Sequence, residues 1–245
     1  MTDKLNTSSP LLDQLRSQAE ERLSSTQNDK TKEQMARNGM DELLWKVHAW
    51  LEEVARYLNK LTPPVSHKFH FPPFLTFQDL TLEQSFVSYR RHRFEEQDLI
   101  KHVEFFYRLK APHPLVVNLS SEEANEVETK MRVAGLTFEV LPTYDQWKHT
   151  QIVQFTIQPE IRSTIRIEPD YVRHNFGFRL SNIDHLEALY MVFSPAQIEE
   201  KMLESLIQLM LGENKEFLKR APWLSHWAPT PAPNASTYRP PRFIG

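Results

Sequence analysis

The chain has 245 residues and a formal net charge of −3 at pH 7, with 40% hydrophobic and 25% charged residues, which is ordinary for a globular protein. It has no cysteine and only 5 glycines. These counts exclude a disulfide framework, a thiolate metal site, a cysteine nucleophile and the glycine-rich loops that cradle phosphates. Because no basic-then-apolar leader and no apolar run of membrane-spanning length is present, we expect a cytoplasmic protein without a membrane partner.

The first 40 residues are polar. A weak helical pattern at Leu12, Leu15, Ala19 and Leu23 is followed by the polar stretch Ser24–Gln34. We therefore predict that residues 1–40 form a frayed helix that gives way to a flexible linker.

A stronger pattern begins at Asp41 and predicts an amphipathic helix over residues 41–61. Pro63 and Pro64 end this helix, because proline cannot continue it. Two interpretations of its apolar seam remain open: the seam packs on the chain's own domain, or it pairs with a second copy or a partner helix. The apolar residues recur at the spacing of a coiled-coil seam: Leu44, Val47, Leu51, Val54, Leu58 and Leu61.

Residues 65–215 predict an α+β domain with helices packed on a largely antiparallel sheet. Residues 67–109 show strand patterns separated by breaks. A β-α-β unit follows over residues 115–141, in which Ser120 and Glu123 form a capping box and Gly135 ends the helix.

A three-strand meander is expected next, with turns at Pro159 and Pro169. In this register Ile157 lies opposite Ile161, and both turns place the same residues on one apolar face. The opposite face of the meander then has a row of arginines: Arg162, Arg166, Arg173 and Arg179.

The arginine row predicts an anion-binding surface. Arg166 lies directly across from Arg173 in this register, and like charges facing each other destabilise a sheet. A phosphate, a carboxylate or an acidic segment of a partner would relieve the repulsion, because guanidinium groups grip such anions with paired hydrogen bonds. The alternative is that Asp or Glu side chains from elsewhere in the fold, for instance from the 195–211 helix, neutralise the row.

A short helix is expected over residues 183–193. A stronger helix begins at Ser194, where Pro195 and Gln197 complete an N-terminal capping pattern, and ends at Gly212.

Residues 222–245 form a proline-rich tail, which we predict to be extended. Its aromatic residues indicate docking, since an extended segment loses little chain entropy on binding. For Trp223 and Trp227, packing on the chain's own domain is the open alternative. The residues predicted to dock are Tyr238, Arg239, Arg242, Phe243 and Ile244.

Other candidate sites are weaker. The stretch Tyr89–Arg93 combines aromatic and basic residues, as some single-strand nucleic-acid surfaces do, but acidic residues follow it at once. His67 and His70 are expected to point to opposite faces of a strand, and His174 is expected on the apolar face of the meander. We predict no catalytic residues, no metal site and no cofactor.

The sequence thus favours a non-catalytic cytoplasmic interaction or scaffold protein. It would associate with itself or with a protein partner through the 44–61 helix, and the tail would provide a second contact. The alternative is an anion-binding module for a nucleotide, a nucleic-acid backbone or a phosphorylated partner, which would use the arginine row.

Overall fold

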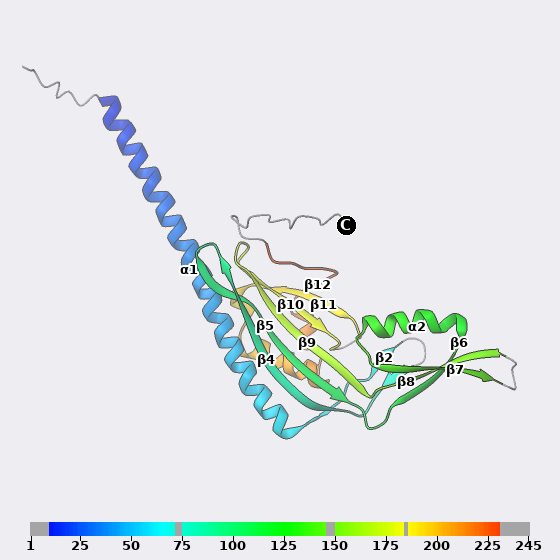
Figure 1. The fold of residues 1–245 in the computed structure, drawn as a ribbon. Coiled ribbons are helices and arrows are strands. Elements are labelled where there is room, and N and C mark those ends of the chain that lie inside the picture. The colour runs from blue at the N-terminus through cyan, green and yellow to red at the C-terminus, as the bar shows by residue number, and fades with distance from the viewer. Residues whose placement is uncertain (1–9, 72–74, 146–149, 184–185, 231–245) are drawn as a thin grey trace, which may run out of the picture.

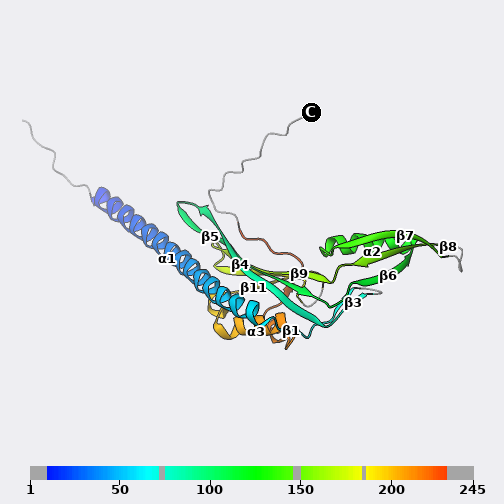
Figure 2. The same ribbon diagram turned by 60° about the horizontal axis from the view of Figure 1, so that its bottom comes forward.

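The computed structural model describes residues 10–71, 75–145, 150–183 and 186–230. It has the predicted α+β architecture, with helices packed against antiparallel sheets. Helices α1 (Pro10–Leu61) and α3 (Glu200–Leu211) cover one face of a seven-stranded sheet, and a smaller three-stranded sheet extends from it (Figures 1 and 2).

Helix α1 is one uninterrupted helix of 52 residues. The polar stretch 24–34 is helical, so the expected linker is absent from the structure. The C-terminal half of α1 packs along the sheet, whereas the N-terminal half extends beyond it (Figure 1). The helix ends at Leu61, before the two prolines.

The large sheet has the strand order β1-β4-β5-β9-β10-β11-β12, and every neighbouring pair is antiparallel. The hairpin of β4 and β5 forms its longest part, and β5 pairs with β9, which follows it in the chain only after the smaller lobe. The strands are β1 (Pro64–Val65), β4 (Leu80–Phe94), β5 (Gln97–Lys110), β9 (Glu160–Asp170), β10 (Asn175–Ser181), β11 (Ala188–Phe193) and β12 (Trp223–Leu224).

The core lies between this sheet and the two helices. Alternate residues of β5 and β9 are buried, which is the period expected of strands that cover a core with one face only. The buried side chains include Leu44, Leu51, Val103, Phe105, Leu109, Ile161, Ile165, Leu206 and Leu209.

The smaller lobe confirms the predicted β-α-β unit. Ser120 and Glu123 form the capping box of α2, and Gly135 takes a positive φ of 71° just after this helix. The three-stranded sheet has the order β6-β8-β7, and a separate two-stranded ladder pairs β2 with β3. The elements are β2 (Phe69–Phe71), β3 (Leu75–Phe77), β6 (Leu115–Ser120), α2 (Ser121–Val133), β7 (Phe138–Asp145) and β8 (Thr150–Ile157).

The predicted meander is wrong at both turns. β8 and β9 do not pair with each other: Ile157 lies opposite Leu115 and Phe138 in the small sheet, while β9 lies between β5 and β10. The chain passes from one sheet to the other at Pro159, a change that alternation of side chains alone cannot reveal. The second turn lies further along than expected, after Asp170, so the register of β9 and β10 differs from the predicted one.

The C-terminal part of the domain also differs in detail. Strand β11 occupies the region expected to be a short helix, and its pairing with β10 satisfies its backbone. Ser194 and Gln197 form the expected capping box, but they open a 3-10 turn before α3 begins at Glu200. Gly212 ends α3 with a φ of 76°.

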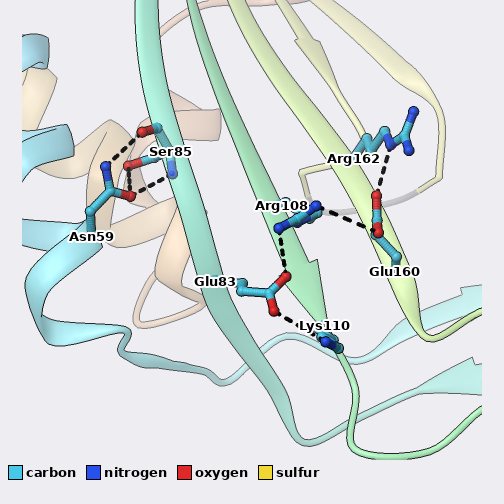
Figure 3. A network of polar contacts seen from close by, with 7 residues as sticks. All are labelled: Asn59, Glu83, Ser85, Arg108, Lys110, Glu160 and Arg162. Atoms are coloured by element: carbon cyan, nitrogen blue, oxygen red, sulfur yellow. Dashed lines mark hydrogen bonds and ion pairs between the residues drawn. The ribbon is translucent and has the colours of Figure 1, made fainter.

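An asparagine of α1 blocks the outer edge of β4. The Asn59 side-chain amide donates to the Ser85 carbonyl oxygen at 2.7 Å, and its Oδ1 accepts from the Ser85 backbone N–H at 2.6 Å (Figure 3). The side chain therefore replaces a neighbouring strand at this point, which protects the edge against pairing with another chain.

Candidate functional site

The residues of the predicted seam face the sheet. Leu44, Val47, Leu51 and Leu58 are buried in the core, Val54 is half-buried against it, and Leu61 is exposed. Four of the six side chains are therefore covered by the chain itself. This agrees with the interpretation that the seam packs on the chain's own domain. In this conformation the seam offers no continuous face to a second copy or a partner helix.

Helix α1 is anchored where it leaves the sheet. Arg37 forms an ion pair with Glu95 at the tip of the β4–β5 hairpin, and its guanidinium lies over the Phe94 ring. Asp41 Oδ1 accepts a hydrogen bond from the Ile100 backbone N–H at 2.6 Å. These contacts fasten the helix to the hairpin.

A tyrosine from the turn between β9 and β10, at the same end of the sheet, reaches the same anchor. The Tyr171 hydroxyl donates to the Ile100 carbonyl oxygen at 2.8 Å and lies 3.3 Å from Asp41 Oδ1. Burial raises the pKa of Tyr171, and the negative charge of Asp41 adds to this shift. The neutral hydroxyl therefore remains a donor at this point, which ties the turn after β9 to α1.

Beyond the anchor, α1 has no tertiary support among the described residues. Every described side chain from Gln14 to Ala36 is exposed, as is that of Leu11. We call residues 10–36 the projecting segment. At 1.5 Å per residue it extends for about 40 Å, and Figure 1 shows it standing clear of both sheets.

The first half of the projecting segment has an apolar stripe. Leu11, Leu15, Ala19 and Leu23 are spaced at intervals of four, so they lie within about a third of the helix circumference. The hydroxyls of Ser24, Ser25, Thr26 and Thr31 donate to carbonyls in the preceding turn of the same helix. Such local bonds do not replace packing, and an isolated helix of this length is only marginally stable in water.

The arginine row is present only in part. Arg162, Arg166 and Arg179 lie on strands, on the sheet face opposite the core, but Arg166 lies across from Arg179. Arg173, expected opposite Arg166, is in the turn after β9. The register differs because the Asp170 side chain accepts from the backbone N–H groups of Val172 and Arg173, which places these residues in a turn.

Acidic residues compensate most of the row. Arg166 lies 2.9 Å from the carboxylate of Glu168 and 3.4 Å from that of Glu104, and Arg162 lies 2.8 Å from Glu160. These acids belong to β5 and β9 rather than to α3. Arg179 is the exception, since no carboxylate of the described residues forms an ion pair with it.

A neutral histidine completes this cluster. His102 is buried, and its Nδ1 lies 2.9 Å from an Arg166 guanidinium nitrogen. Burial, followed by the positive charge of Arg166, lowers the pKa of His102 to about 4. The imidazole is therefore neutral at pH 7 and accepts a hydrogen bond from Arg166.

Two stacked phenylalanines lie on the same sheet face and are absent from the sequence predictions. Phe86 lies opposite Phe106, and Phe106 lies opposite Thr164 on β9. The two rings are 4.8 Å apart with an interplanar angle of 17°, and Phe86 is 53% exposed. A depression of about 260 Å³ is formed over them, with Arg108 and Arg162 in its lining.

The first part of the tail folds back across this sheet face. Trp223 pairs with Met191 as part of β12, and the Trp227 ring covers Gly177 so closely that a Cβ there would meet it at 2.2 Å. For Trp227 the structure therefore supports packing on the chain's own domain, whereas Trp223 remains 51% exposed although its backbone pairs in β12.

An aspartate holds the end of this folded-back segment, residues 223–230, which we call the strap. Thr230 donates from its backbone N–H and its hydroxyl to Asp170 Oδ2, at 2.9 and 2.6 Å. Burial alone would raise the pKa of Asp170, but these bonds and those from Arg173 and Val172 together lower it. The predicted docking residues Tyr238, Arg239, Arg242, Phe243 and Ile244 lie outside the described residues.

The basic and aromatic stretch 89–93 acquires two aromatic neighbours from α1. Tyr89 makes edge contacts with Trp45 and His48, and Arg91 lies over the Trp45 ring while it pairs with Asp98. The Tyr89 ring and the Arg91 side chain thus make contacts within the chain, as expected of a structural cluster.

Among the residues that the structure describes, no group of three His, Asp or Glu side chains is arranged to hold a metal ion. His67 bonds the Leu209 carbonyl, and His174 lies in the turn after β9, not on the apolar face where it was expected.

Comparison with protein-family models, with curated proteins and with solved structures finds no match. No helix in the described part of the chain is long and apolar enough to cross a membrane. The case for function therefore depends on the surfaces described above.

Proposed function

We propose that this chain is a non-catalytic interaction protein of the cytoplasm, which docks to a partner protein through the projecting segment of α1. The observation that supports the proposal is the exposure of every described side chain from Gln14 to Ala36, in a helix that is continuous with a firmly packed half. A helix without tertiary packing gains stability when its apolar stripe is buried, and a groove on another protein supplies such burial.

The stripe indicates how the partner binds. Leu11, Leu15, Ala19 and Leu23 have the spacing of the anchors with which a helix enters an apolar groove. The anchor at Arg37 and Asp41 supports this role, because it fixes the direction in which the segment leaves the domain. A depression of about 430 Å³ between the helix and the hairpin tip, lined by charged residues, lies beside the point of exit.

The test is co-purification from the native cell of the chain and of variants with altered exposed leucines. A double variant, Leu15→Ser with Leu23→Ser, should lose a stoichiometric partner. Leu61→Ser is the matched control, because Leu61 is as exposed as Leu23, 70% in each case, but belongs to the packed half. Light scattering of the purified chain separates a second copy from a different protein as the partner.

Either of two outcomes refutes the proposal. They are retention of the partner by the double variant and equal loss of the partner with Leu61→Ser. Deleting residues 231–245 tests the predicted tail contact in the same experiment.

Anion binding by the arginine row is a second candidate, favoured by one observation. Arg179 has no carboxylate partner among the described residues, and its guanidinium lies over the Tyr190 ring. If the row binds a phosphorylated ligand, affinity should fall steeply with salt, and Arg179→Gln should weaken it.

A further inference from the structure

We infer that the depression over Phe86 and Phe106 binds an acidic segment of a partner protein. The segment places one large apolar side chain on the two rings and a carboxylate against Arg108 and Arg162. This surface belongs to the open face of the sheet, so the inference does not depend on the projecting segment.

The position of the depression follows from the register of three strands. Phe86, Phe106 and Thr164 form one row across β4, β5 and β9, and Gln84, Arg108 and Arg162 lie in the adjacent row. Helices α1 and α3 cover the other face of the sheet, and the strap contacts β10 and β11. Among the described residues, none outside these three strands lines the depression.

The floor of the depression is apolar. The stacked rings leave Phe86 53% exposed. A side chain that covers both rings removes apolar surface from water and adds an aromatic or aliphatic contact. The volume of about 260 Å³ is below the range usual for small-molecule pockets, so it fits a single large side chain better than a whole ligand.

The rim has more positive than negative charge. Lys110, Arg108 and Arg162 share two carboxylates, those of Glu83 and Glu160 (Figure 3). The hydrogen bond from Lys110 lowers the pKa of Glu83, so this carboxylate is charged at pH 7. One cation of the three is therefore uncompensated, which matches a carboxylate beside the apolar anchor.

The same charges argue against other occupants. A nucleic-acid backbone has a negative charge at every phosphate, and some of these would meet Glu83 and Glu160. The chain's own residues 231–245 include two arginines and neither aspartate nor glutamate, so they have no side-chain carboxylate to pair with the cations of the rim. A peptide that places one carboxylate at the rim and one apolar side chain on the rings avoids both conflicts, because its other carboxylates can point into solvent.

The test is a titration followed by backbone amide NMR. The probe is a blocked pentapeptide with two glutamates before and two glutamates after one phenylalanine. The peptide should shift the amides of Phe86, Phe106 and Thr164. Replacing its phenylalanine by alanine, or its glutamates by lysines, should weaken binding about tenfold or more.

Variants of the chain locate the site. Phe86→Ser and Arg162→Glu should each weaken binding of the peptide about tenfold. Arg132→Glu on α2 is the matched control and should leave affinity unchanged. Arg132 and Arg162 are both exposed arginines that form an ion pair with a glutamate. The side-chain exposure is 67% for Arg132 and 74% for Arg162. Arg162→Gln provides a second variant if the charge reversal disturbs folding.

Three outcomes would overturn the inference. They are shifts confined to other surfaces, equal binding of the alanine peptide, and binding of a five-nucleotide thymidine oligomer at least as tight as that of the peptide. The oligomer has the same charge as the peptide, so the last result would assign the surface to nucleic acid.

Discussion

The same substitution should lower stability strongly in the packed half of α1 and hardly at all in the projecting segment. Leu51 is fully buried against the sheet, whereas Leu23 is 70% exposed in the projecting segment. Leu51→Ala removes buried methyl groups and leaves a cavity, so it should lower the free energy of unfolding by about 2–5 kcal/mol. Leu23→Ala removes little buried surface and replaces leucine by a better helix former, so its effect should stay within about 0.5 kcal/mol.

Urea unfolding of the two variants and the unsubstituted chain measures this contrast. For a chain of this size, a loss of about 3 kcal/mol corresponds to a fall in Tm of roughly 6–12 °C. The slope of the free energy with urea should not change, because both variants retain the fold. Leu61→Ala, at the exposed end of the packed half, should resemble Leu23→Ala.

Equal losses in Leu51→Ala and Leu23→Ala would refute the reasoning. That result would mean either that the packed half contributes little to stability, or that the projecting segment is buried against something in the isolated chain. Light scattering at the concentration used for unfolding distinguishes the two explanations, since burial of the segment between copies would raise the mass.

Three further predictions concern the sheet. Because the pKa of His102 is about 4 in the folded chain and near 6.5 when unfolded, the unfolded state binds more protons between these values. The contribution of His102 to the free energy of unfolding should therefore be complete above pH 6.5 and fall, by up to about 3 kcal/mol, as the pH drops to 4. In His102→Gln, the free energy of unfolding should depend less on pH over this window. Asn59→Leu should unfold about 1–3 kcal/mol more easily and aggregate faster by light scattering, because the backbone groups of Ser85 lose their partner; unchanged stability would contradict the edge-blocking role. Gly177→Ala should displace Trp227 and speed proteolysis of the strap without unfolding the domain; an unchanged cleavage rate would contradict the packing of the strap.

Local features of the fold could be predicted well. The capping boxes at Ser120 and Ser194 and the glycine that ends α3 all form as expected, because each depends on residues within one helical turn. The α+β class follows from the same local patterns. The break expected within residues 24–34 is absent, since polar residues can extend a helix that the following residues anchor.

Contacts between distant residues could not be predicted. The pairing of β5 with β9 joins strands separated by the entire smaller lobe, so no turn between them signals their register. The contact of Tyr171 with Asp41 spans 130 residues. Phe86 and Phe106 read as ordinary members of alternating strands, and only the register places them together on the open face.

Hydrogen exchange along α1 tests the central claim most directly. In the isolated chain, amides of residues 14–34 should exchange by local opening within seconds to minutes, while those of residues 44–58 should show the protection of the packed core. In the complex with the co-purified partner, the projecting segment should become protected around Leu11, Leu15 and Leu23, with little change in the packed half. A segment that exchanges equally fast with and without the partner would contradict the proposal that this helix is the docking element.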